Sequence, residues 1–232
     1  MATERKLKLA VWDVDGTLVD SRASILKGLQ EAAAILGLNE PTYEDVRQIV
    51  GLSLLEAIQS MRPDLALDVA ERYAYEYKQS FIRAHAQPDF HEPLYDGADA
   101  CLRRLKAEGW LMGMATGKSR RGIERNTAVY DWHGIFDCSF CADDGPSKPH
   151  PHMLKCNLDH LGVDPHQTVM IGDTAHDIRM GLSAGVYTIG VSWGFHTVDE
   201  LKAAGAHIIV HDFDQLNAAL DAFVPENVKA AI

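Results

Sequence analysis

Polar residues with oxygen-bearing side chains follow three short apolar runs of the chain. The runs are 7–12, 110–115 and 168–171, and the polar residues after them are Asp13 and Asp15, Thr116, and Asp173 with Asp177. Carboxylates gathered in one crevice repel one another unless a cation lies between them. Oxygen-only ligands suit a hard ion such as Mg²⁺, which takes one or two carboxylates, waters and substrate phosphate. If the three runs are neighbouring parallel strands, we expect a magnesium site where they end.

The elements that would bring these residues together are short strands alternating with helices. Five runs are candidate strands, at 7–12, 110–115, 138–141, 168–171 and 187–191. Each is bounded by turn residues and followed by a helix-like stretch, which is typical of βα units and a parallel sheet buried on both faces. Ligands of open parallel sheets bind outside the carboxyl ends of the strands. The sequence therefore predicts an α/β, Rossmann-like core whose strand ends carry the site.

One long stretch breaks this alternation. From about residue 21 to about residue 85 only helical patterns occur, including a long amphipathic helix over 66–84. We expect an all-helical cap domain inserted after the first strand, above the carboxyl edge of the sheet, with 86–96 as the returning linker. The predicted domains are a catalytic core at 1–18 and 93–232 and a helical cap at 19–92.

Four segments together resemble the motifs of the haloacid dehalogenase superfamily. They are DVDGTLVDS (13–21), ATGKS (115–119), SKPHP (147–151) and GDTAHDI (172–178), and they occur in the family's order. The helical insertion between the first two matches the family's helical cap. YDGA (95–98), Ala184-Gly185 and SWG (192–194) fit the phosphoglycolate phosphatase-like subgroup. The resemblance covers essentially the whole chain.

The resemblance implies a catalytic role for three residues. Asp13 is the nucleophile, whose carboxylate attacks phosphorus to give an aspartyl-phosphate. Asp15 is the general acid for the leaving oxygen and then the base for the hydrolytic water. Lys148 neutralises phosphate charge. An anionic nucleophile that attacks an anionic phosphate meets charge repulsion, which a metal ion, a lysine and aligned N–H donors offset.

The same resemblance implies which residues bind the phosphate and the metal. Gly16 and Thr17 form a tight turn next to the phosphate, and Thr116 and the Gly117 N–H bind its oxygens. The implied cofactor is Mg²⁺, and the implied metal residues are Asp13, Asp15, Asp173 and Asp177. Asp173 binds the ion together with the Asp13 carboxylate and the Asp15 carbonyl, whereas Asp177 orients a metal-bound water or Lys148.

The function predicted from this pattern is a Mg²⁺-dependent phosphatase of small phosphomonoesters, with phosphoglycolate as the leading named substrate. A dehalogenase is not expected to carry an acid/base Asp at position 15, and a phosphonatase would lack it and need a Schiff-base lysine. A sugar phosphomutase keeps both aspartates and remains an alternative. A non-catalytic phosphate-binding regulatory protein is a further alternative, although its expected mark, loss of Asp13 or Asp15, is missing.

Two tempting ligand motifs fail on spacing. Gly117-Lys118-Ser119 suggests a nucleotide P-loop, but only three residues separate Gly113 from Gly117 where that motif has four. The set Cys138, Cys141, His150 and His152 suggests zinc, but its spacings do not match a zinc finger. We expect these cysteines to be free.

Charge and composition bound the partners. The chain has 22 Lys and Arg against 33 Asp and Glu, a net charge of −11, which argues against nucleic acid as a partner. No apolar run is long enough to span a membrane, no apolar signal segment follows the charged start, and four cysteines are too few for a disulfide framework. We expect a cytoplasmic protein that binds a small phosphorylated metabolite. The sequence does not indicate the oligomeric state, and residues around 47–53 are expected to set specificity.

Overall fold

The computed structural model describes residues 7–87 and 90–225. Its centre is a six-stranded sheet in the order β3-β2-β1-β4-β5-β6, with all neighbours parallel. The strands are β1 (Leu9–Trp12), β2 (Leu111–Thr116), β3 (Cys138–Cys141), β4 (Thr168–Gly172), β5 (Tyr187–Val191) and β6 (Ile208–Val210). The chain runs outward from β1 to β3 and then returns to β4 on the other side of β1. This reversal between β1 and β4 is where open sheets bind ligands.

All five predicted strands form, and the predicted α/β fold with a parallel sheet is confirmed. The central strand β1 is buried on both faces, with every residue 0% exposed, as a covered parallel sheet requires. The sixth strand, β6, was not predicted. It has only three residues, of which the first is exposed and the second half-buried, so it gives no continuous buried run.

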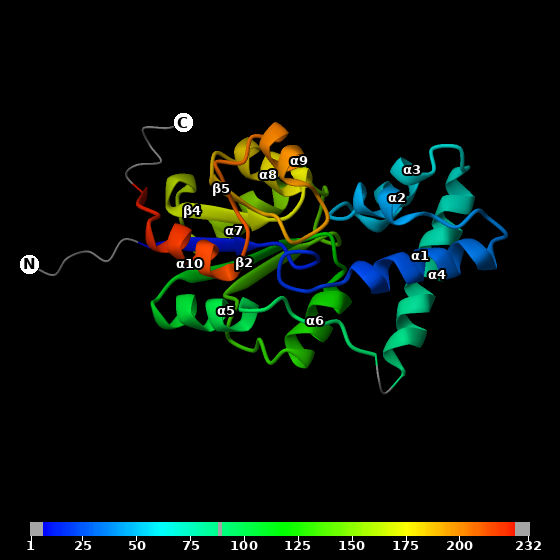
Figure 1. Ribbon diagram of the computed structural model, residues 1–232, viewed down its shortest axis with the longest axis horizontal. Coiled ribbons are helices and arrows are strands. Elements are labelled where there is room, and N and C mark those ends of the chain that lie inside the picture. Colours follow the sequence, from blue (N-terminus) through cyan, green and yellow to red (C-terminus); the bar gives the residue numbers. More distant parts are fainter. Residues whose placement is uncertain (1–6, 88–89, 226–232) are drawn as a thin grey trace, which may run out of the picture.

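Helices cover both faces of the sheet (Figure 1). One face packs against α5 (Ala98–Ala107), α6 (Arg120–Val129) and α10 (Phe213–Asp221). The other packs against α7 (His152–Leu161), α8 (Ala175–Ser183) and α9 (Val198–Ala203), and a short 3₁₀ turn, Pro165–Gln167, precedes β4. Trp12 and Val11 of β1 belong to the two different core clusters, because successive side chains of a strand point to opposite faces.

The stretch predicted to be all-helical contains four helices and no strand over its described residues. They are α1 (Arg22–Ile35), α2 (Tyr43–Arg47), α3 (Leu54–Met61) and α4 (Leu67–His85); we call residues 22–85 the helical block. The block has an apolar cluster of its own, which includes Leu29, Ile58 and Tyr73 and one core residue, Phe195. Figure 1 shows it beside one end of the sheet rather than on either face.

Two adjacent chain segments join the block to the core. Val19 and Leu94 form an antiparallel bridge. The Asp20 N–H donates to the Pro93 carbonyl at 2.8 Å, and the Tyr95 N–H to that of Leu18 at 3.0 Å. The predicted domain boundaries stay a prediction. Residues 88–89 of the predicted linker, and 1–6 and 226–232 of the predicted core, lie outside the described residues.

Within the described part of the chain, no helix combines the length and apolar character needed to cross a membrane.

Candidate active site

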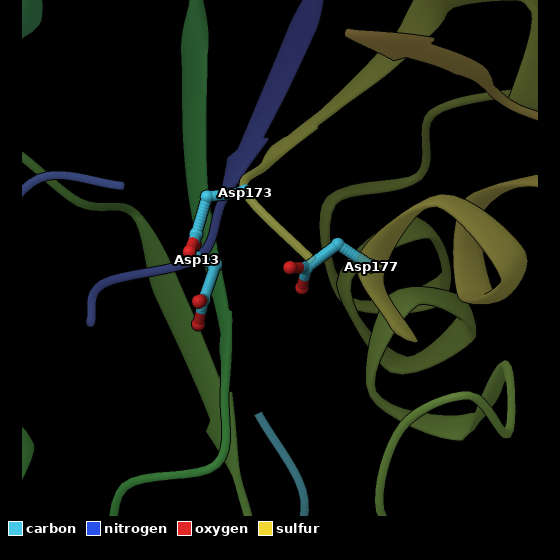
Figure 2. A group of neighbouring side chains, drawn as sticks. All are labelled: Asp13, Asp173 and Asp177. Carbon is cyan, nitrogen blue, oxygen red and sulfur yellow. The ribbon is translucent and has the colours of Figure 1, made fainter. Parts of the chain in front are cut away.

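The ends of the central strands bring the predicted carboxylates together. Asp13 directly follows β1 and Asp173 directly follows β4, while Asp177 lies in the first turn of α8. Each offers a carboxylate oxygen, and these oxygens all lie within 4.8 Å of one another. Figure 2 shows the three side chains converging from the strand ends and from α8. All three are buried, so water does little to screen their mutual repulsion.

A glycine turn after β1 fixes the position of Asp173. Gly16 has φ +84°, and a Cβ at this residue would lie 2.3 Å from Asp173 Oδ2, so only glycine fits. The next residue, Thr17, donates its hydroxyl to Asp173 Oδ1 at 2.8 Å, and the Phe195 N–H donates to Oδ2 at 2.8 Å. The turn predicted to contact phosphate therefore also orients a predicted metal residue.

Lys148 lies between two of the carboxylates. Its Nζ is 2.7 Å from Asp13 Oδ1 and 2.6 Å from Asp177 Oδ1, and its side chain is 0% exposed. Burial lowers the pKa of Lys148, but Asp13 and Asp177 outweigh burial and raise it above its usual value. The lysine is therefore a fixed, buried positive charge next to the predicted nucleophile.

Asp177 has both a structural and an electrostatic role. Its Oδ2 accepts hydrogen bonds from the Thr174 N–H at 3.0 Å and the Thr174 hydroxyl at 2.7 Å, which completes a capping box at the start of α8. Its Oδ1 faces Lys148. Two roles were possible for Asp177, orienting a metal-bound water or orienting Lys148. Its position beside Lys148 fits the second role.

The buried carboxylates outnumber the cations beside them. Burial raises the pKa of Asp13 to about 7, with Asp177 adding to this and Lys148 opposing it. Burial, Asp13 and Asp177 raise the pKa of Asp173 well above its usual value. Asp13 Oδ2 has no hydrogen-bond partner among the described residues. An oxygen-only, buried and under-compensated cluster fits a hard divalent cation.

The other predicted residues lie on the β2 side of the site. Asp15 Oδ1 is 2.8 Å from Lys118 Nζ. Thr116 ends β2 fully buried, and its hydroxyl accepts the Lys118 N–H at 3.3 Å. A Cβ at Gly117 would lie 2.8 Å from the Leu52 carbonyl oxygen, so glycine allows the helical block to approach closely here.

The predicted specificity loop, residues 47–53, lies on the core rather than in solvent. The Arg47 guanidinium binds Glu200 of α9 at 2.7 Å, and the Gln48 amide donates to the same carboxylate at 2.8 Å. His176 donates from Nε2 to the Gln48 carbonyl at 3.1 Å. Its side chain is half-buried at this contact. His196 donates from Nε2 to the Arg47 carbonyl at 3.1 Å.

Sequence reasoning missed several residues near the site. Lys118 lies inside ATGKS, where the sequence suggests only a P-loop lysine. Glu200 and His196 lie outside the motifs, and their partners Arg47 and Gln48 are about 150 residues away in the chain. The only signal was a Thr-x-x-Glu capping box at the start of α9, which marks a helix start and not a contact.

No histidine or cysteine takes part in a metal-type cluster within the described residues, where the one candidate group is Asp13, Asp173 and Asp177. All four cysteines are free, as predicted.

Several known proteins are similar to this chain. The sequence model of the family described as haloacid dehalogenase-like hydrolase matches residues 10–191. A protein of Dickeya dadantii named "Probable phosphatase IndB" is 32% identical over 220 residues, covering 93% of this chain and 94% of that protein. The phosphoglycolate phosphatase of Psychrobacter arcticus is 27% identical, covering 90% and 94%. The crystal structure of a predicted phosphatase from Clostridium acetobutylicum superposes with a TM-score of 0.82 at 25% identity, covering 93% and 98%.

The chain therefore belongs to the haloacid dehalogenase-like hydrolases. Its similarity to proteins named phosphatases confirms the predicted class of enzyme, a hydrolase of phosphate esters.

Proposed function

We propose that this enzyme hydrolyses small phosphomonoesters through an aspartyl-phosphate on Asp13, with Mg²⁺ as its cofactor and phosphoglycolate as the first substrate to test. The observation that carries the proposal is the buried cluster of Asp13, Asp173 and Asp177 with Lys148 at the switch point of the sheet. A phosphoryl group has both a nucleophile and positive charge available there.

Each of these residues has a separate role in the proposed reaction. An Asp13 carboxylate oxygen forms a bond to phosphorus as the bond to the leaving oxygen breaks, and Asp15 gives that oxygen a proton. In the second half, water attacks phosphorus, the bond to Asp13 breaks, and Asp15 takes the proton from the water. Lys148 is an unscreened charge at the nucleophile, and Thr116 and the Gly117 N–H are proposed to bind the phosphoryl oxygens.

The donor set for the metal consists of Asp13, Asp173 and the Asp15 carbonyl, with Asp177 beside them. A bound Mg²⁺ would supply positive charge that polarises the phosphoryl group. The chain's own contribution is to hold the donors in place through Gly16, Thr17 and the Phe195 N–H.

The helical block is proposed to form most of a cap domain over the site. The predicted limits of that cap domain are residues 19–92. Its loop 47–53 contacts the core beside Lys148 and Thr174, because a Cβ at Gly51 would lie 3.8 Å from Lys148 Cδ and 3.4 Å from Thr174 Oγ1. Closure of this kind excludes water and strengthens charge interactions. A small organic phosphate fits under such a cap, whereas a phosphoprotein or nucleic acid does not.

Replacement of the nucleophile tests the proposal. Phosphate release in Mg²⁺ buffer is measured for phosphoglycolate, a sugar phosphate, p-nitrophenyl phosphate and a phosphopeptide. Asp13→Asn should abolish release with the fold intact, because the amide is the same size but a poor nucleophile. Asp159→Asn, at an exposed position on α7, is the matched control and should keep full activity.

Near wild-type turnover by pure Asp13→Asn contradicts the assignment of the nucleophile. A sugar phosphate that is isomerised without net phosphate release supports the phosphomutase alternative instead. Binding of phosphate esters without any turnover supports the non-catalytic alternative.

A further inference from the structure

The loop after β5 contacts Asp173 at three points. Gly194 approaches so closely that a Cβ at this position would collide with the Asp173 carboxylate. The Phe195 N–H donates to Asp173 Oδ2 at 2.8 Å, and the His196 N–H donates to the Asp173 carbonyl at 3.3 Å. Thr17, from the turn after β1, donates to the other carboxylate oxygen. Asp173 is therefore held from two sides, and the loop after β5 is one of them.

The ring of Phe195 packs with the helical block, although its backbone belongs to the core. The residue is only 3% exposed and lies in the apolar cluster of the block. Its ring stacks on that of Tyr43 in α2, with the ring centroids 6.4 Å apart and an interplanar angle of 24°. It also lies against the turn after β1, because a Cβ at Gly16 would be 2.6 Å from Phe195 Cδ2. The ring therefore contacts both the block and the turn that orients Asp173.

The next residue makes a similar connection with hydrogen bonds. The His196 ring donates from Nε2 to the Arg47 carbonyl of the block at 3.1 Å. Its Nδ1 accepts the Ala175 N–H, in the first turn of α8, at 3.0 Å. Phe195 and His196 thus hold Asp173 with their backbone and the block with their side chains.

A metal ligand binds well only if it is held in one orientation. Partners outside the ligand set supply that orientation, and losing one typically weakens metal binding by about 10–100-fold. A backbone N–H is only as well fixed as the loop that carries it. Trp193 fixes the start of this loop on the core, since its Nε1–H donates to the Thr17 carbonyl at 3.0 Å. In the following stretch, 194–197, Phe195 is the only large apolar side chain, so it is the anchor at the point where the loop meets Asp173.

We propose that Phe195 is a positioning residue for the metal site: its ring, held against the helical block and the turn after β1, fixes the backbone N–H that orients the Asp173 carboxylate. The proposal rests on the metal role of Asp173 given under Proposed function. Phe195 supplies no atom to the metal or the substrate. A shorter side chain keeps the N–H but releases the loop, so Asp173 Oδ2 loses a donor in a fixed place.

The test is the Kd of Mg²⁺ for Phe195→Ala, measured by calorimetric titration of the metal-free protein with MgCl₂ and no substrate. We expect the Kd to rise about tenfold, at the lower end of the range for such partners, because the N–H itself remains. The matched control is Phe81→Ala in α4. Phe81 packs against the same apolar cluster, but its ring lies next to Gly28 of α1. Both variants should lower the thermal midpoint, and only Phe195→Ala should raise the Kd.

Two further variants separate positioning from a general loosening of the block. Phe195→Leu keeps most of the apolar volume, so it should raise the Kd by less than Phe195→Ala does. Glu200→Gln removes the charge that faces Arg47 of the block and leaves Phe195 untouched. Because the anchor proposed here is apolar and separate from that ion pair, Glu200→Gln should keep the wild-type Kd.

A wild-type Kd in folded Phe195→Ala would overturn the proposal. A rise in Phe81→Ala as large as that in Phe195→Ala would also overturn it, because the stability of the whole block would then set the affinity. If Phe195→Ala does not fold, Phe195→Leu decides, and an unchanged Kd in that variant counts against the proposal. No Mg²⁺ binding by the wild type would overturn the metal part of the proposed function and this proposal together, and that result is recognised without any variant.

Discussion

The part of the site around Asp13, the proposed nucleophile, is held together differently from the contacts of the helical block. We call this part the nucleophile side. Asp13, Lys148, Asp173 and Asp177 all come from the core, and all are buried. The main polar contact of the block, Arg47 with Glu200, crosses between the two regions, with side chains 13% and 30% exposed. The first set depends on unscreened charge, whereas water and salt weaken the second.

Because of this difference, we expect the chemical step and the access of substrate to the site to depend on different parts of the molecule. The nucleophile side is preorganised by bonds within the core, such as those from Thr17 and Phe195 to Asp173. The Arg47–Glu200 contact of the block is polar and partly solvated, so it can break and reform at little cost. Substitutions in the first region should therefore change chemistry and stability together, while those in the second should change only the closing of the block.

The largest effect is expected at Lys148. Lys148→Met leaves Asp13 and Asp177 buried without their cation, and breaking such a buried pair costs about 3–5 kcal/mol of unfolding free energy. Loss of the charge at the nucleophile should also lower kcat by at least about a hundredfold, by analogy with the loss of other preorganised electrostatic groups. Denaturant unfolding and phosphate release measure the two effects. Lys155→Met, exposed on α7, is the control, and retention of both properties by Lys148→Met contradicts the preorganised-charge argument.

A smaller effect is expected from the metal. The cluster of Asp13, Asp173 and Asp177 has too little positive charge, so we expect it to bind Mg²⁺. By mass action, Mg²⁺ at a hundredfold excess over its Kd should then stabilise the folded chain by about 2.7 kcal/mol. Thermal midpoints with Mg²⁺ and with EDTA show this without any substrate. Asp173→Asn should remove most of the Mg²⁺-dependent shift, whereas Asp159→Asn should keep it. An identical shift in wild type and Asp173→Asn places the ion elsewhere.

The sequence predicted the nucleophile side much better than the block contacts. Asp13, Thr116 and Asp173 are visible because each ends an apolar run, and parallel strands must bring such ends to one edge. The same logic recovered five strands but not β6, of whose three residues the first is exposed and the second half-buried. The site residues remain assignments from motif and geometry, and the metal's identity remains part of the proposal.

The block contacts escaped prediction for a physical reason. Arg47 and Glu200 are 153 residues apart and Ser24 and Glu92 are 68 apart, and none of them lies at a strand end. An isolated surface charge is usually solvated, so its type carries no information about a partner. The local pattern at Glu92 likewise predicts a polar linker, whereas its side chain is buried and bonded to Ser24 of α1.

The smallest effect is expected where the block meets α9. Glu200→Gln removes the charge facing Arg47 but keeps an oxygen for the Thr197 capping box. Such partly exposed ion pairs are worth at most about 1 kcal/mol, so unfolding free energy should change by less than that. Weaker closure should lower kcat/KM by no more than about fivefold, mainly through KM, since 1.4 kcal/mol is about tenfold. The effect should shrink in high salt, because salt screens exposed charges.

Steady-state kinetics at low and high salt measure this effect. The control is Asp199→Asn, at the exposed neighbour of Glu200 in the first turn of α9. A loss of kcat as large as that of Lys148→Met would show that the block contacts belong to the chemistry, and the separation of the two regions would be wrong.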